Sequence, residues 1–158
     1  MSYLIDIQHA CNEETPVSDD LLIKWAELAL CEHKDSAELT LRLVNTEEIQ
    51  QLNHDYRAQN KATNVLAFPA VVPEVVELDY PLLGDVIICP SVLAKESLTL
   101  GKPLEEHWAH IVIHGILHLL GYDHIKDDET EVMQALEIKL LASLGFANPY
   151  QTEDDEVG

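Results

Sequence analysis

The segment that most restricts the fold is residues 103–120, because a helix here would be apolar on nearly all of its faces. Its apolar residues are Leu104, Trp108, Ile111, Val112, Ile113, Ile116, Leu117, Leu119 and Leu120. A helix that is hydrophobic all round belongs in a protein interior. Pro103 suits the first turn, and Gly121 stands where a left-handed residue commonly ends a helix. We therefore expect the rest of the chain to pack around this helix.

The remaining sequence predicts a mixed order of strands and helices. Alternating or apolar runs predict strands at residues 2–9, 37–44, 65–68 and 82–89. Capping residues and helical spacing predict helices at residues 19–33 and 46–57, from residue 90 onward, and at residues 127–144. The apolar character of residues 82–89 favours a central place in the sheet.

We predict a single α+β domain over residues 1–150, in which a small mixed four-stranded sheet packs with about five helices. Residues 151–158 are expected to be an acidic, disordered tail. Ser18 can cap the helix at residues 19–33. Asn45 and Glu48 have the spacing of a capping box for the next helix.

Composition limits the classes of partner. The chain has 158 residues and a formal net charge of −20, from 29 acidic and nine basic residues. Such a charge repels polyanions at long range and by itself argues against nucleic-acid binding. No apolar run approaches the roughly 20 residues of a membrane span, so we expect no membrane partner. The lack of a visible signal peptide and three scattered cysteines indicate a reducing cytoplasm.

Histidines recur along the buried helix at helical spacing. His110, His114 and His118 are four residues apart and therefore share one face. A turn at Gly121 would bring His124 back toward the end of the helix. His114, His118 and His124 would then converge on one metal ion in the pattern HxxxHxxGxxH, the spacing of the metzincin zinc proteases. Three imidazoles suit a tetrahedral zinc and leave its fourth position for water.

Each histidine also has a simpler interpretation. A lone histidine on an apolar helix is usually a core residue with satisfied hydrogen bonds, and we assign His110 to the core or to a contact with a metal ligand. For the three-histidine set, burial without partners would cost free energy that a shared metal removes. His9, His33 and His54 are expected at the surface.

Gly115 stands where HExxH enzymes carry the glutamate that acts as general base. A protease mechanism of that kind is therefore disfavoured. A bound zinc still lowers the pKa of its water toward about 7, and an RNA phosphodiester has its own 2′-hydroxyl as a nucleophile. Glycine within a helix costs up to about 1 kcal/mol relative to alanine, so it needs a reason. Close approach of a substrate backbone or of a packed strand would supply one.

The stretch HGILHLLGYDH resembles the motif HGxLHLxGYDH of the YbeY family of bacterial endoribonucleases. The resemblance extends over nearly the whole chain, through HWAH, LLGDVIIC and LNHDYRAQNKATNVLAFP. It implies an α+β fold, one zinc ion held by the three histidines, and cleavage of single-stranded RNA. It also implies a role in 16S rRNA 3′-end maturation and ribosome quality control, with the small ribosomal subunit and its associated proteins as partners.

The resemblance further implies functional roles for Arg57, in the family's YR motif, and for His114. A guanidinium beside a metal can hold a phosphate and stabilise charge that develops on its oxygens. Without the family, Arg57 is equally a surface residue that ends a helix. Asp85 can fix a turn, and Asp123 can cap a turn or accept a hydrogen bond from a metal-binding imidazole, so neither is assigned a catalytic role.

The chain departs from the family around its YR motif. Gln59 and Asn60 replace a Lys-Asp pair, and Asn64 stands where aspartate is frequent. Asn64 cannot act as a carboxylate base, and the phosphate contact of a lysine at position 59 is lost. Lys61 can compensate for that loss.

Two questions remain open at the level of sequence. The first is how RNA binds to so acidic a chain: through a local groove with Arg42, Arg57 and Lys61, or through presentation of the substrate by the ribosome. The second is whether another function fits better. A metal-dependent peptide hydrolase agrees with the metzincin spacing but not with Gly115. A noncatalytic, ribosome-associated zinc protein would bind metal and cleave nothing.

Overall fold

The computed structural model describes residues 2–11, 15–59, 63–70, 81–122 and 127–150. Its elements are β1 (Ser2–Ala10), α1 (Asp19–Leu30), β2 (Ser36–Val44), α2 (Thr46–Arg57), β3 (Val65–Pro69), β4 (Leu82–Ile88), α3 (Pro90–Leu100), α4 (Leu104–Leu119) and α5 (Asp127–Ser143). A four-stranded mixed sheet with five helices in this part of the chain confirms the α+β prediction. The domain limit at residue 150 stays a prediction, and residues 151–158 lie outside the described residues.

The strands lie in the order β1-β2-β4-β3. The strands β1, β2 and β4 run parallel, whereas β3 pairs antiparallel with β4. The predicted central position of β4 is therefore confirmed, and its Val86, Ile87 and Ile88 are buried. The antiparallel strand β3 lies at one end of this order, beside β4 alone.

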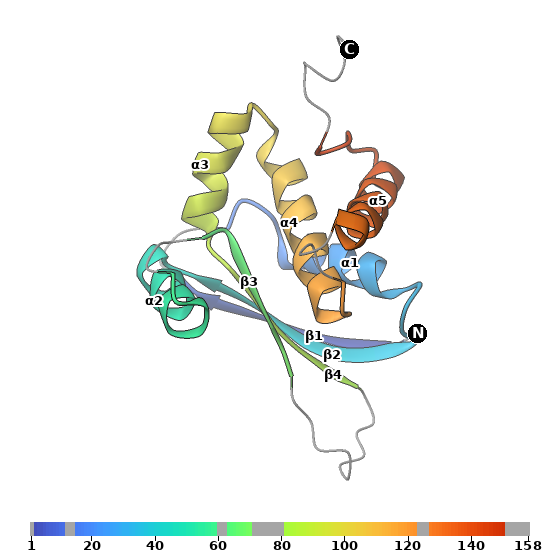
Figure 1. Cartoon of the computed structure of the whole chain (residues 1–158), viewed down its shortest axis with the longest axis horizontal. Coiled ribbons are helices and arrows are strands. Elements are labelled where there is room, and N and C mark those ends of the chain that lie inside the picture. The colour runs from blue at the N-terminus through green and yellow to red at the C-terminus, as the bar shows by residue number, and fades with distance from the viewer. Residues whose placement is uncertain (1, 12–14, 60–62, 71–80, 123–126, 151–158) are drawn as a thin grey trace.

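Helix α4 is the buried helix that the sequence predicts. Trp108, Ile113 and Ile116 are completely shielded from solvent. The helix contacts α1, α3, α5, β3 and β4, so neighbours surround it on most sides. Figure 1 shows α1, α4 and α5 grouped over the sheet, with α2 apart from them at one end. This burial fixes the orientation of every histidine that α4 carries.

The two faces of the sheet have different cores. Along β2 burial alternates, and Leu39, Leu41 and Leu43 join the large cluster formed with α1 and α4. Ile49 of α2 belongs to a smaller cluster of buried residues, together with Val44, Leu66, Ile87 and Cys89. Helix α2 therefore rests on its own small core, and its last residue is Arg57.

The two predicted helix caps have different outcomes. Ser18 caps α1 as predicted, because its Oγ accepts a hydrogen bond from the Leu21 backbone N–H at 3.2 Å. The capping box at α2 is wrong: Asn45 occupies the N-cap position but its side chain makes no capping hydrogen bond. The Glu48 carboxylate instead accepts from the Arg42 guanidinium at 2.8 and 3.3 Å. An ion pair with the neighbouring strand has replaced the local contact.

The end of α4 follows the predicted turn. Gly121 has a positive φ of 104°, which favours glycine, and the Tyr122 N–H donates to the Leu117 carbonyl at 3.0 Å. The Tyr122 hydroxyl also forms a 2.8 Å hydrogen bond with His33 Nε2. His33 is therefore partly buried and bonded, whereas His9 and His54 are exposed as expected.

None of the described helices is both long enough and apolar enough to cross a membrane.

Candidate functional site

The site begins with the histidine stripe of α4. The ring centroids of His110 and His114 are 6.2 Å apart, and those of His114 and His118 are 4.7 Å apart. His110 and His114 are mostly buried, with 14% and 23% of their side chains exposed. His114 and His118 therefore lie next to each other one helical turn apart, as the spacing predicts.

A cleft opens beside this stripe, between α4, the end of α2, and β3 with the two residues before it. It is lined by Arg57, Thr63, Asn64, Val65, Ala67, His114, Gly115 and His118. The structure thus brings together Arg57, His114 and His118, which are up to 61 positions apart in the sequence. The left-handed Ala58 ends α2 immediately after Arg57, so the arginine stands at the very end of a helix.

Gly115 lets α4 approach the sheet. A Cβ atom at this position would lie 2.6 Å from Val86 Cγ1 of β4 and 3.4 Å from Val65 Cγ2 of β3. Contacts as short as 2.6 Å are not tolerated, and Val86 is a buried, β-branched residue with little freedom to move. Of the two reasons that the sequence allowed for this glycine, the structure supports a packed strand.

Helix α5 adds a carboxylate beneath the histidines. Glu137 is completely shielded from solvent, and its Oε1 lies 2.5 Å from His114 Nδ1. Its Oε2 accepts a hydrogen bond from the Tyr150 hydroxyl and lies 3.4 Å from His110 Nε2. The Tyr150 hydroxyl is also 3.2 Å from His110 Nε2. We call Glu137, Tyr150, His110 and His114 the buried polar cluster.

The ionisation of this cluster follows from its contacts. Burial on its own would raise the pKa of the Glu137 carboxyl, but hydrogen bonds from His110, His114 and Tyr150 outweigh it and lower the pKa to about 2. Burial, followed by the adjacent Glu137 carboxylate, raises the pKa of Tyr150 well above its usual value. Burial lowers the pKa of His110 more than its contact with Glu137 raises it. The cluster therefore holds a carboxylate with a neutral Tyr150.

Two arrangements could hold a metal ion here: the predicted pair of His114 and His118, or a group formed with Glu137. His110, His114 and Glu137 offer ligand atoms that all lie within 4.8 Å of one another. However, two donors bound to one tetrahedral zinc at about 2.0–2.1 Å lie roughly 3.3 Å apart. The 2.5 Å between His114 Nδ1 and Glu137 Oε1 is instead a hydrogen-bond length. Because Nδ1 of His114 contacts Glu137, a metal shared with His118 would bind Nε2 of His114.

Some predicted residues lie outside the described residues. These are His124, Asp123, Asn60 and Lys61. The third predicted ligand and the proposed compensating lysine therefore remain predictions. The described end of α4 is compatible with His124 as the third ligand, because the backbone turns at Gly121 as the motif predicts.

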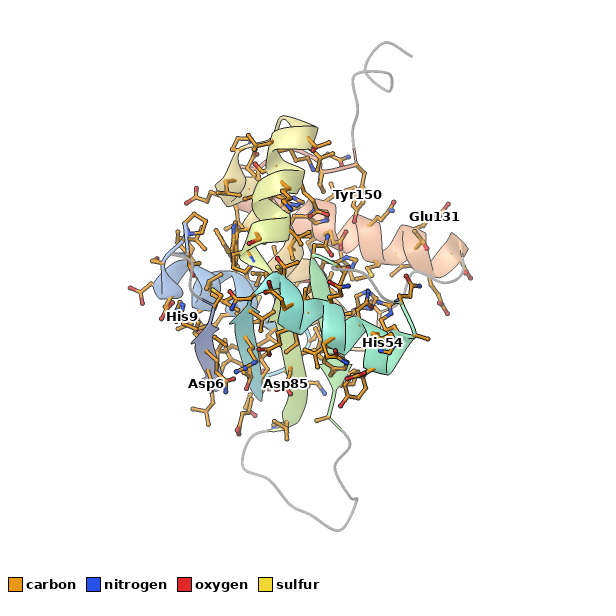
Figure 2. The ribbon with its side chains drawn as sticks, turned by 90° about the vertical axis from the view of Figure 1, so that its left-hand side faces the viewer. Asp6, His9, His54, Asp85, Glu131 and Tyr150 are labelled. Atoms are coloured by element: carbon orange, nitrogen blue, oxygen red, sulfur yellow. The ribbon has the colours of Figure 1, made fainter. Side chains whose placement is uncertain are left out.

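The predicted positive groove is wrong for Arg42. This residue does not line the cleft, and its guanidinium bonds Glu48 and, at 3.1 Å, the side chain of Gln8. Asp85 is exposed on β4 and does not line the cleft either; Figure 2 shows it in the sheet. Arg57 is the one basic side chain among the described residues that line the cleft.

A second carboxylate, Glu96 of α3, holds one wall of the cleft. The Asn64 side-chain amide donates to both Glu96 oxygens at 3.3 Å, and His107 Nε2 lies 2.9 Å from Glu96 Oε1. The donation from Nδ2 leaves the Asn64 carbonyl oxygen as a hydrogen-bond acceptor. Sequence reasoning missed Glu96, Glu137 and Tyr150, because each is a single polar residue without a spacing that marks it.

Comparison with known proteins agrees with this geometry. The family described as Endoribonuclease YbeY matches residues 8–145 of the chain. The chain belongs to this family. A relative from Legionella pneumophila (strain Corby), named Endoribonuclease YbeY, is 59% identical over 157 residues and is matched over 99% of both chains. A relative of the same name from Pseudomonas putida (strain F1) is 54% identical, with 96% of this chain and 94% of the relative covered.

A solved structure has a similar fold. The solution structure of TM1509 from Thermotoga maritima superposes with a TM-score of 0.57, covering 94% of this chain and all of that one. At 23% identity this likeness concerns the fold alone. The family match and the relatives confirm the resemblance that the histidine motif indicates.

Proposed function

We propose that this member of the YbeY family is a zinc-dependent endoribonuclease that cleaves single-stranded RNA in the cytoplasm, at the cleft between α4 and β3. Its expected substrate is the 3′ end of the 16S rRNA precursor, and its expected role includes ribosome quality control with small-subunit proteins. The observation that carries this proposal is the convergence of Arg57, His114 and His118 in one cleft. The named activity of the relatives supports the same reaction class.

The donor set fits zinc. His114 and His118 would hold the metal with His124, and imidazole nitrogens are among the ligands that zinc prefers. A bound zinc supplies a Lewis acid and an activated water at neutral pH. His114 has the second role of presenting a fixed imidazole edge to the cleft, because its other nitrogen is bonded to Glu137.

Arg57 would bind the scissile phosphate. Its planar guanidinium can donate two parallel hydrogen bonds to phosphate oxygens and stabilise the charge that develops during cleavage. Asn64, held by Glu96, would offer its carbonyl oxygen to a ribose hydroxyl or a base edge. Asn64 orients substrate in this scheme and takes no proton, since an amide is not a base.

The rival peptidase function has little support. Its usual general base is absent at Gly115, and the contact of this position with Val86 leaves no room for a glutamate Cβ. The cleft also has a cation suited to phosphate.

A cleavage assay on metal-quantified protein tests the proposal. Wild-type protein loaded with zinc is expected to cut single-stranded RNA, and zinc-free protein should not. Casein should stay intact with zinc and without it. Protein with His114→Ala should cut neither. Peptide cleavage without RNA cleavage would reverse the assignment, and a zinc-loaded protein that cuts neither substrate would favour the noncatalytic alternative.

A further inference from the structure

The buried polar cluster under α4 contains a carboxylate that the proposed reaction does not use. Glu137 has no exposed surface, and it cannot contact substrate in the cleft. Burying a carboxylate is strongly unfavourable unless hydrogen bonds and charges compensate for it. Here His110, His114 and Tyr150 all approach its two oxygens. A role that requires this carboxylate would explain why an apolar residue does not occupy the position.

The contacts of Glu137 divide between its two oxygens. Tyr150 donates its hydroxyl hydrogen to Oε2, so this oxygen acts as an acceptor. Oε1 faces Nδ1 of His114 at 2.5 Å. With the carboxylate accepting on both sides, Nδ1 of His114 must carry the hydrogen, and Nε2 must carry the lone pair. This is the tautomer that a metal bound at Nε2 requires.

The C-terminal end of the described chain holds this arrangement in place. Lys102 Nζ donates to the Pro149 carbonyl at 3.1 Å, and the Ala147 N–H donates to Glu106 Oε1 at 3.2 Å. These bonds join the segment after α5 to the start of α4. They place Tyr150 over Glu137, so the carboxylate is fixed from both of its sides (Figure 2 labels Tyr150).

We propose that Glu137 is a positioning residue, which fixes the tautomer and ring orientation of His114 through Nδ1 and so preorganises the metal site before the metal binds. The proposal rests on the proposed function in one respect, that His114 is a metal ligand. Carboxylates that accept from a metal-binding histidine typically contribute 10-fold to 100-fold in metal affinity. Glu137 is expected to contribute on that scale.

Glu137→Gln tests this role, because it keeps the shape of the side chain and removes its charge. Glu131→Gln is the matched control, since Glu131 is an exposed carboxylate of the same helix, toward its N-terminal end (Figure 2). Zinc affinity is measured by competition with a chromophoric chelator. The tautomer of His114 is read from imidazole nitrogen shifts in metal-free protein, and folding stability from urea unfolding.

Glu137→Gln should weaken zinc binding about 10-fold or more, and His114 should populate both tautomers in the metal-free protein. Glu131→Gln should change neither quantity. Tyr150→Phe keeps the carboxylate beside His114 and should cost less affinity than Glu137→Gln.

Three results would overturn the proposal. The first is wild-type zinc affinity and an unchanged tautomer in Glu137→Gln. The second is an equal loss of affinity in Tyr150→Phe and Glu137→Gln, which would assign the effect to general packing. The third is complete loss of zinc in Glu137→Gln with retention in His118→Ala, which would place the metal among His110, His114 and Glu137. A failure of RNA cleavage in wild-type protein would contradict the proposed function but leave the tautomer measurement intact.

Discussion

At the scale of single residues, the site depends on two positions with opposite properties. Arg57 places a positive charge in the cleft. Gly115, which also lines the cleft, matters because it has no side chain. Neither can be replaced by a similar residue without a specific cost: lysine lacks the forked guanidinium, and alanine lacks space against Val86. We therefore expect substitutions of Arg57 to change the rate of RNA cleavage and substitutions of Gly115 to change the stability of the fold.

Arg57→Ala should fold and bind zinc normally but lose RNA cleavage about 100-fold or more, the usual cost of removing one group that stabilises developing charge. Arg57→Lys should recover only part of the rate, since an ammonium is a point charge. Cleavage rates on a single-stranded oligonucleotide, at equal zinc content, provide the measurement. A wild-type rate in Arg57→Ala would show that the arginine has no role in the reaction.

Gly115→Ala should lower the free energy of unfolding by about 1–3 kcal/mol, because the new methyl group overlaps Val86 Cγ1 in a packed core. Gly115→Glu carries the same Cβ and should be at least as unstable, with slower RNA cleavage and no useful peptidase activity. Urea unfolding of Gly115→Ala, Val86→Ala and the double variant forms a cycle. The double variant should lose less than the sum of the single losses; strict additivity would contradict the packing explanation.

At the scale of elements, helix α4 contributes residues both to the hydrophobic core and to the candidate site. One face of the helix carries Trp108 and Ile116 into the interior, and another carries His114 and His118 to the cleft. Its close approach to β3 and β4 and its glycine turn at Gly121 set where a following ligand can lie. Metal binding is therefore a property of this helix and its turn, and it is best tested there.

Alanine at His114, His118 or His124 should abolish stoichiometric zinc, whereas His110→Ala should retain about one zinc per chain. The physical reason is that His110 contacts Glu137 and Tyr150 rather than the cleft. Elemental analysis after exhaustive dialysis measures the occupancy. Full occupancy in all three cleft variants would refute the three-histidine site, and loss of zinc in His110→Ala alone would point to the buried polar cluster.

At the scale of the whole molecule, charge is the dominant constraint. A net charge of −20 opposes RNA binding, while the described lining of the cleft contributes a single cation, Arg57. With the engagement of Arg42 by Glu48, the structure offers less intrinsic attraction for a polyanion than the sequence allowed. Presentation of the substrate by the ribosome, the other explanation of how RNA binds, stays a prediction.

RNA affinity should accordingly be weak and should depend little on salt. For single strands the slope of log affinity against log salt is about −0.7 per neutralised phosphate. A slope between about 0 and −2 is expected from equilibrium titrations with zinc-loaded Arg57→Lys and wild-type protein. Arg57→Ala should flatten the slope by roughly 0.7. A wild-type slope steeper than about −4 would reveal a basic surface that the cleft does not contain.

The sequence determined the local features of this protein. Spacing alone identified the buried helix, the stripe of histidines and the glycine turn, because each depends on residues within a few positions of one another. The central strand was also predictable, since a strand buried on both faces must be apolar. The position of Arg57 in the site came from the family motif, because the end of a helix does not by itself show which other elements it lies beside.

Only the tertiary structure decided the long-range partners. Glu48 has the spacing of a capping residue, yet it pairs with Arg42, because a neighbouring strand offers a charged donor that the local backbone cannot match. Glu137 looks like one more acid on a helix, and its burial against His114 arises only when α5 packs on α4. Gly115 had two explanations until β4 was placed against it. These contacts join residues 6 to 29 positions apart on different elements, and no periodicity in a sequence encodes which elements meet.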